Sequence, residues 1–272
     1  MAKKKPESES NELAVSSVSK YALMKSDPKK IAELLITNLG DDELGEFDLE
    51  RIKFPSGGTP AFTRTNEKGT QVVNEIEGVI LYAGNRRAYW EKAYGEGDTG
   101  GPPDCSSVDA KIGIGKIEGD DKSTEVGTFK RICKQCPMSQ FGTGKDSAGK
   151  PSKGQACQQR KVLIMAVADS VLPICISLPP TSLKTYKEYA YSLTCSAKDI
   201  RSVVTKISLQ VVPVSGGPDY AKAVIKAGED LTPTEFEGIV AMVDTLGKVF
   251  SSVGIEAEDR PQGATVNGVV VD

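Results

Sequence analysis

The sequence predicts an α+β protein built on a small antiparallel β-barrel, with flanking helices and a long four-cysteine insert. Three observations predict it. Alternating or apolar stretches typical of strands recur at 71–82, 161–168, 171–178 and 202–212. Helical signatures stand near both ends of the chain. Between the strands, a segment rich in glycine and lysine interrupts the pattern over residues 95–160.

The N-terminal region divides into a tail and a helix. Residues 1–20 are polar and charged, which predicts a disordered tail. Asp27 is a candidate N-cap and Pro28 stands at the first helical position. The apolar spacing that follows predicts a helix ending at Gly40.

The central region reads as strands. Gly78 inside 71–82 indicates a bulge or bend, and 85–90 is expected to be the hairpin partner of that strand. After the insert, a helix over 181–197 separates the last two strands. Thr232-Pro-Thr-Glu235 opens a further helix, and 254–272 is expected to be a flexible tail. The domain would therefore run from 21 to 253.

Composition excludes several classes of function. The chain of 272 residues contains no histidine, which excludes Ser-His-Asp and Cys-His mechanisms and histidine-ligated zinc. We therefore expect no enzymatic activity. The sequence has no apolar run long enough for a membrane span and no apolar core of a signal peptide. These observations predict a cytoplasmic protein with reduced thiols and no membrane partner.

Four cysteines have the spacing of a metal site. Cys133 and Cys136 form a Cys-x-x-Cys knuckle, and Cys105 and Cys157 flank it at distances of 28 and 21 residues. Four thiolates suit one structural zinc ion, because they leave no open position for a reactive water. An iron–sulfur cluster is the alternative. Cys175 and Cys195 lie in expected core elements and are not counted among the ligands.

Charge is distributed unevenly along the chain. Residues 129–161 contain eight basic residues and one acidic one, whereas 228–272 contain two basic and nine acidic ones. Aromatic residues lie next to the basic segments. Cations that follow phosphates, together with rings that stack on bases, are typical of single-strand binding. The candidate phosphate contacts are Lys130, Arg131, Lys134, Lys145, Lys150 and Lys153, and the candidate base contacts are Arg86, Arg87, Tyr89 and Phe141.

Several motifs together resemble a family of phage and mobile-element proteins. They are Arg87-Ala-Tyr89-Trp90, Pro102-Pro-Asp-Cys105-Ser-Ser, Cys133-x-x-Cys136-Pro, Gly154-Gln-Ala-Cys157 and Leu178-Pro-Pro-Thr-Ser182. The family is similar in plan to phage single-stranded-DNA-binding proteins, in which a zinc loop interrupts an oligonucleotide-binding (OB) barrel. The resemblance implies an OB-like fold and an acidic C-terminal region that contacts replication proteins. Here, however, the segment after Glu258 is not densely acidic.

The sequence thus predicts a non-enzymatic protein that binds single-stranded DNA without sequence specificity during phage or mobile-element replication or recombination. One structural zinc ion would order the basic insert. A zinc-stabilised protein–protein adaptor or regulator is the first alternative. A nuclease or recombination factor with an iron–sulfur cluster is the second.

Overall fold

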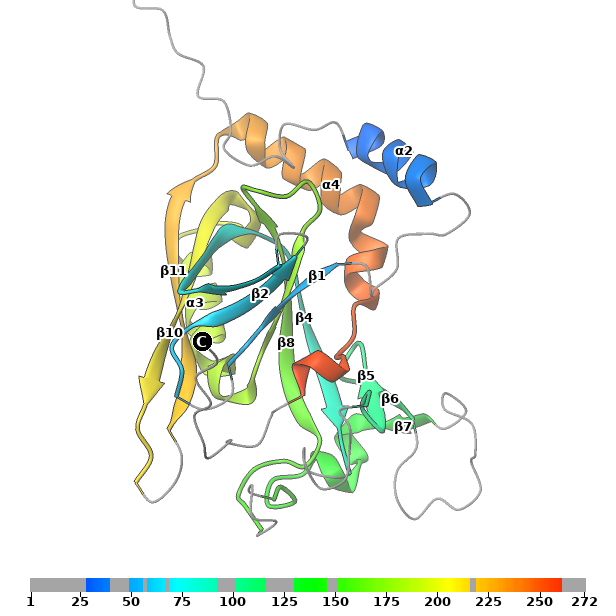
Figure 1. The fold of residues 1–272 in the computed structure, drawn as a ribbon, viewed down its shortest axis with the longest axis vertical. Coiled ribbons are helices and arrows are strands. Elements are labelled where there is room, and N and C mark those ends of the chain that lie inside the picture. Colours follow the sequence, from blue (N-terminus) through cyan, green and yellow to red (C-terminus); the bar gives the residue numbers. More distant parts are fainter. Residues whose placement is uncertain are drawn as a thin grey trace, which may run out of the picture.

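The computed structural model describes residues 28–39, 49–55, 58–66, 69–91, 101–115, 130–145, 151–215 and 219–260. These residues form an α+β fold dominated by one sheet (Figure 1). Its strands are β1 (Glu50–Lys53), β2 (Phe62–Asn66), β3 (Gly69–Val73), β4 (Glu75–Tyr89), β5 (Cys105–Ser107), β6 (Ile112–Gly115), β7 (Lys130–Ile132), β8 (Gln158–Val167), β9 (Ile174–Leu178), β10 (Val203–Val212) and β11 (Tyr220–Asp230). The α-helices are α2 (Pro28–Leu39), α3 (Leu183–Cys195) and α4 (Pro233–Ser252).

The long strand β4 organises the sheet. On one edge it pairs with β8 along most of its length. On the other edge its first residues pair with β10 and its last residues pair with β5. The complete order is β3-β2-β1-β9-β8-β4-β5-β6-β7, with β10 and β11 branching from β4. All pairs are antiparallel except β1 with β9.

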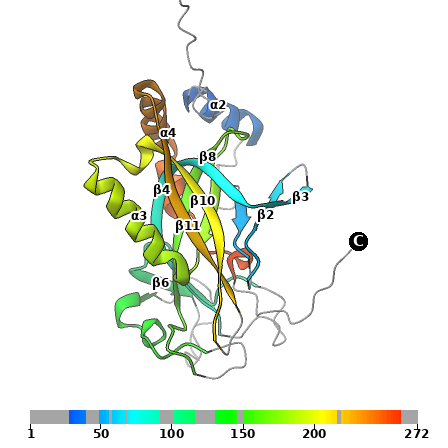
Figure 2. The ribbon, with the colours of Figure 1, turned by 90° about the vertical axis from the view of Figure 1, so that its left-hand side faces the viewer.

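Two apolar cores lie on opposite faces of the sheet. On one face, Ile239, Met242 and Phe250 of α4 pack on alternate residues of β4 and β8. On the other, Tyr189 and Leu193 of α3 pack on the residues between them. Figures 1 and 2 show the sheet between these two helices. Burial on both faces explains why the central strands are almost continuously apolar.

The sheet is open, so the barrel prediction was wrong while the α+β class is confirmed. In the described chain no ladder joins β11 to β2 or β3. The loop between β1 and β2 instead packs close to the β10–β11 hairpin: a Cβ at Gly58 would lie 3.1 Å from Cβ of Asp219 and 3.4 Å from Cγ1 of Val211. Because a barrel closes only through hydrogen bonds between its end strands, this packing leaves a curved, open sheet.

Three strand assignments also change. The expected hairpin at 85–90 does not exist, because β4 runs straight through Gly84 to Tyr89. The register shift expected near Gly78 falls between Ile80 and Tyr82. Strand β11 was not expected at all. Its alanines, lysines and glycine give a weak strand signal, and pairing with β10 along nearly its whole length makes it a strand.

The helix predictions are confirmed within the described residues. α2 begins at Pro28, and α4 begins with a capping box in which Thr232 and Glu235 bond each other's backbone N–H. The expected cap at Asp27, the stop at Gly40 and the tail 1–20 lie outside the described residues. No helix in the described parts of the chain is both long and apolar enough to cross a bilayer.

The flexible tail expected from residue 254 was placed too early. Residues 254–260 pack against the sheet, with Ile255 buried and a short 3-10 helix, η5, at Ala257–Asp259. Arg51 of β1 donates to the carbonyl of Gly254 and to the carboxylate of Asp259. The remainder of the expected tail, 261–272, lies outside the described residues.

Candidate nucleic-acid interface

The insert gathers its four cysteines at the far end of β4. Cys105 opens β5 and lies opposite Tyr89, the last residue of β4. Cys133 begins the 3-10 helix η1 (Cys133–Gln135), and Cys136 precedes η2 (Pro137–Ser139). Cys157 immediately precedes β8, and its N–H bonds the carbonyl of Met138 in η2. Strand pairing and backbone hydrogen bonds therefore bring distant cysteines together.

The four thiols are free and buried, with exposed fractions of 6–7%. Cys105, Cys136 and Cys157 pack with Tyr89 in one cluster. Cys133 joins them at Gly113, where an added Cβ would lie 3.0 Å from Sγ of Cys105 and 3.6 Å from Sγ of Cys133. Glycine at 113 thus lets two sulfurs approach the backbone of β6.

The four thiols are chemically suited to bind one metal ion. Their side chains, however, are not arranged as in a metal site that is already assembled. Among the described residues, no group of three or more His, Cys, Asp or Glu side chains is arranged to hold a metal ion. Burial raises the pKa of Cys105 to about 11 and that of Cys157 to about 12, so a metal would have to displace their protons. Zinc at these residues stays a prediction.

The Cys-x-x-Cys knuckle is held by its own backbone and by nearby side chains. Ser139 donates its hydroxyl to the carbonyls of Cys133 and Cys136. Gln140 donates its amide to the carbonyls of Lys134 and Cys136. These bonds satisfy carbonyls that a tight turn would otherwise leave without donors. The described part of the insert is consequently more regular than its glycine content suggests.

The predicted lysines lie on the surface of this insert. Lys130 begins β7, Lys134 lies in η1, and Lys145 and Lys153 lie in the loop that leads to Cys157; all four are exposed. Arg131 is half-buried and faces Gly113 across the β6–β7 pair. Lys150 lies outside the described residues. The cysteine cluster thus supports an outer layer of positive charge.

Among the described residues, Phe141 is the most exposed of the large apolar side chains, at 82%. It precedes Gly142, whose φ of +88° is a conformation that glycine adopts readily. The N–H of Gly142 bonds the carbonyls of Lys153 and Gly154, so Phe141 lies beside the backbone of Lys153. The loop therefore presents an exposed ring next to the backbone of Lys153, whose side chain is also exposed.

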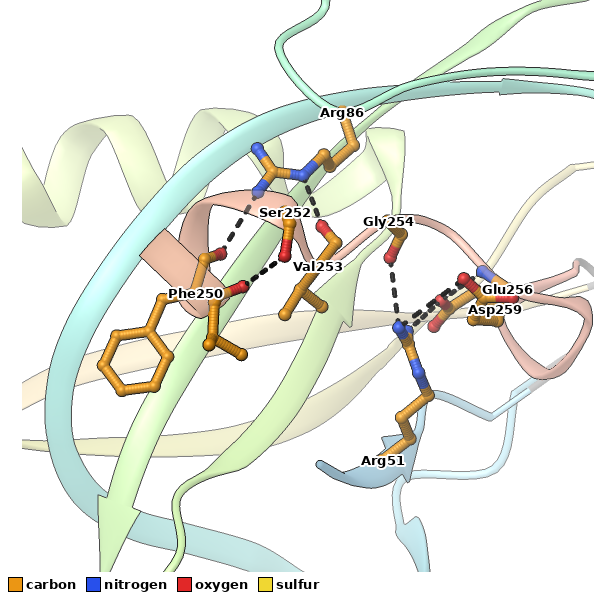
Figure 3. Close-up of polar contacts among 9 residues, drawn as sticks. Arg51, Arg86, Phe250, Ser252, Val253, Gly254, Glu256 and Asp259 are labelled. Carbon is orange, nitrogen blue, oxygen red and sulfur yellow. Dashed lines mark hydrogen bonds and ion pairs between the residues drawn. The ribbon is translucent and has the colours of Figure 1, made fainter. Parts of the chain in front are cut away.

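Arg86 does not lie at a surface, which corrects its assignment as a base contact. Its side chain is 1% exposed on the α4 face of the sheet. Its Nε donates to the carbonyl of Val253 and its Nη2 to that of Phe250, at the end of α4 (Figure 3). Nη2 also donates to the carbonyl of Ser251. The last carbonyls of a helix have no N–H donors within the helix, and a guanidinium with five N–H donors can supply them. Arg86 is a buried helix cap.

Tyr89 and Arg87 also differ from expectation. Tyr89 is 7% exposed and packs on the cysteines, so its ring is not open to a base. Arg87 is half-buried and donates to the carbonyl of Cys157 and the amide oxygen of Gln159. Burial raises the pKa of Cys133 and Cys157, and the positive charge of Arg87 offsets part of that rise. Arg87 therefore links the sheet to the cysteine cluster.

The sequence analysis missed Lys161 as a site residue. It was counted among the cations of the basic segment but not among the candidate contacts. In the structure it lies opposite Asn85 and on the same face of the sheet as Arg87, with its ammonium 4.8 Å from the ring centroid of Tyr186. The alternation of β8 could have placed Lys161 and Gln159 on one face, but only the register with β4 adds Asn85 and Arg87.

Comparisons of the chain with family models, with curated proteins and with solved structures give no match. The interface is therefore interpreted from its own geometry and chemistry.

Proposed function

We propose that this protein binds single-stranded DNA, without sequence specificity and without enzymatic activity, as proteins of phage or mobile-element replication and recombination do. The observation that carries the proposal is the exposed ring of Phe141 beside the backbone of Lys153, in an insert whose described residues also include the exposed Lys130, Lys134 and Lys145. Such a surface combines the two elements of single-strand binding, a ring for the bases and cations for the phosphates.

Zinc at Cys105, Cys133, Cys136 and Cys157 is part of the proposal. Three of the four free thiols lie in one buried cluster and Cys133 lies near Cys105 at Gly113, so zinc would hold that end of the insert in one shape. Elemental analysis of the purified chain would distinguish one zinc per chain from the iron and sulfide of a cluster. The acidic segment 228–272 is proposed as the contact for replication proteins.

The decisive experiment is a fluorescence-anisotropy titration of a labelled oligothymidine and of a matched duplex over a range of salt. We expect single-strand affinity that falls steeply with salt. Phe141→Ala should weaken it about tenfold, the typical value of one stacked base. Tyr191→Ala removes another exposed aromatic, 69% exposed, from α3 and is the control. Absence of single-strand binding at low salt would overturn the proposal.

A second function, that of a protein–protein adaptor, is favoured by the outer face of β6 and β7, which also carries Lys130. Ile112 and Ile132 lie opposite each other on β6 and β7, with Ile114 next along, and they are exposed by 40%, 49% and 41%. Aliphatic side chains do not stack on bases, but they suit a protein surface. An adaptor would retain its metal and bind a protein partner while showing no affinity in the titration.

A further inference from the structure

A strip of polar side chains lies on the α3 face of the sheet, between two buried clusters. We call it the basic ledge: Asn85 and Arg87 of β4, Gln159 and Lys161 of β8, and Tyr186 of α3. Asn85 lies opposite Lys161, and Arg87 lies opposite Gln159. Because side chains alternate along a strand, all four sheet residues project from the same face.

The ledge interrupts an otherwise apolar face. Above it, Leu163 and Met165 continue the β8 alternation into the core under α3, and both are fully buried. Below it, Tyr89 and Cys157 belong to the cysteine cluster. An apolar residue at position 161 would have joined the two buried clusters, so a lysine there is not needed for the core.

The two cations of the ledge are half-buried, and their described contacts are with neutral groups. Among the described residues, neither Lys161 nor Arg87 forms an ion pair with a carboxylate. Lys161 has the ring of Tyr186 as its neighbour, and Arg87 has a carbonyl and an amide oxygen. Burial and the charge of Arg86 lower the pKa of Lys161. Holding such charges away from water costs free energy that an anion would offset.

The ledge is accessible to solvent on one side, and it contains neutral side chains that can donate hydrogen bonds to an anion. Asn85 is exposed, so the strip opens to solvent at its β4 side. The amides of Asn85 and Gln159 can donate hydrogen bonds, and arginine and lysine are the usual partners of phosphate oxygens. On β4, the edge between the residues paired with β10 and those paired with β5 has no ladder partner among the described strands.

We propose that the basic ledge is a phosphate-binding site. Resting on the proposed function, we further assign its ligand as a phosphodiester of single-stranded DNA that passes from the exposed lysines of the insert onto the sheet. Lys161 and Arg87 would neutralise the phosphate, and the amides of Asn85 and Gln159 would orient it. Arg87 thus acts on the backbone of the strand rather than on a base.

Two measurements on Lys161→Gln test the ledge. In the oligothymidine titration, affinity at low salt should fall about tenfold or more. The slope of log K against log salt should decrease by about 0.7, the value of one lost phosphate contact on a single strand. Independently, inorganic phosphate should raise the Tm of the wild type more than chloride at equal ionic strength, and this difference should disappear in the variant.

Lys248→Gln is the matched control, because Lys248 is an exposed lysine of α4, on the opposite face of the sheet. It makes the same change of charge and should leave both readouts unchanged. Lys161→Arg keeps the charge and should retain most of the salt slope. Circular dichroism and the Tm in chloride establish that each variant is folded. If Lys161→Gln does not fold, Lys161→Met replaces it in both measurements.

The outcomes separate the two proposals. Oligothymidine binding with an unchanged slope and unchanged phosphate effect in Lys161→Gln would overturn the ledge and leave the proposed function standing. Phosphate stabilisation that depends on Lys161, in a protein without oligothymidine affinity, would support the anion site and overturn single-stranded DNA as its ligand. If Lys248→Gln lost as much oligothymidine affinity as Lys161→Gln, the effect would be one of net charge alone, and the ledge proposal would be overturned.

Discussion

At the scale of single residues, the neighbours Arg86 and Arg87 show how strand alternation separates roles. Arg86 points into the core under α4 and caps that helix. Arg87 points to the opposite face and reaches the cysteine cluster. Both are basic residues beside aromatic ones in the sequence, which is why both were predicted to contact bases. Only the face on which each side chain lies distinguishes a structural guanidinium from one open to an anion.

Arg86→Gln should destabilise the fold by about 3 kcal/mol, because it leaves buried carbonyls at the end of α4 without donors. Urea denaturation measures the change. Arg201→Gln removes the partly exposed Arg201–Asp199 ion pair of η4 (Ile200–Ser202) and should cost less than about 1 kcal/mol. A stable Arg86→Gln protein with reduced oligonucleotide affinity would instead favour a direct DNA contact.

At the scale of elements, the insert is a small sheet laid over a cysteine cluster. β5, β6 and β7 continue the main sheet beyond the end of β4. Their inner face carries Cys105 and Gly113, and their outer face carries Ile112, Ile114 and Ile132. Gly113 has no side chain, which leaves room for the sulfurs of Cys105 and Cys133 on the inner face. The isoleucines on the outer face are exposed, because no described segment covers them. One short sheet thus separates a candidate metal site from a candidate contact surface.

Cys133→Ser combined with Cys136→Ser should expose the insert to proteases and abolish metal content, because the knuckle supplies two of the four predicted ligands. Limited proteolysis followed by mass spectrometry, together with elemental analysis, measures both effects. Cys195→Ser is the control, since Cys195 is an exposed thiol of α3. If the double variant keeps both an intact insert and its DNA affinity, the cysteines do not have the proposed role.

At the scale of the whole molecule, residues 253–260 act as a strap across one end of the sheet. Arg86 bonds the strap at Val253 and Arg51 bonds it at Gly254 and Asp259, as Figure 3 shows. Arg260 lies over the ring of Trp90, 5.8 Å from its centroid, beside the start of the insert. The strap therefore connects α4, β1 and the insert end of β4.

Two truncated chains measure the strap. A chain ending at Ser252 should be less stable than a chain ending at Arg260 by about 3 kcal/mol or more, since it loses the burial of Val253 and Ile255 and the partners of two arginines. Thermal and urea denaturation of the two chains give the difference directly. Equal stability would mean that the expectation of a loose segment from residue 254 was right.

Much of the fold could be predicted because it is encoded locally. The capping box before α4, the proline that opens α2 and the apolar runs of β8 and β9 are signals within a few residues. The strand β11, the straight passage of β4 through Gly84 and the packed strap could not be predicted. Each depends on pairing or packing with another segment: β11 on its hairpin partner β10, β4 on the more distant β8, and the strap on the distant Arg51.

The sequence by itself determined the α+β class, the uneven charge, the absence of histidine and the cysteine spacing, since these depend only on residue type and order. The tertiary structure alone decided that the sheet stays open, that Arg86 and Tyr89 are buried, and that Lys161 joins Arg87 on one face. The physical reason is that burial, and the side of a sheet on which a charge lies, follow from register and packing between distant segments.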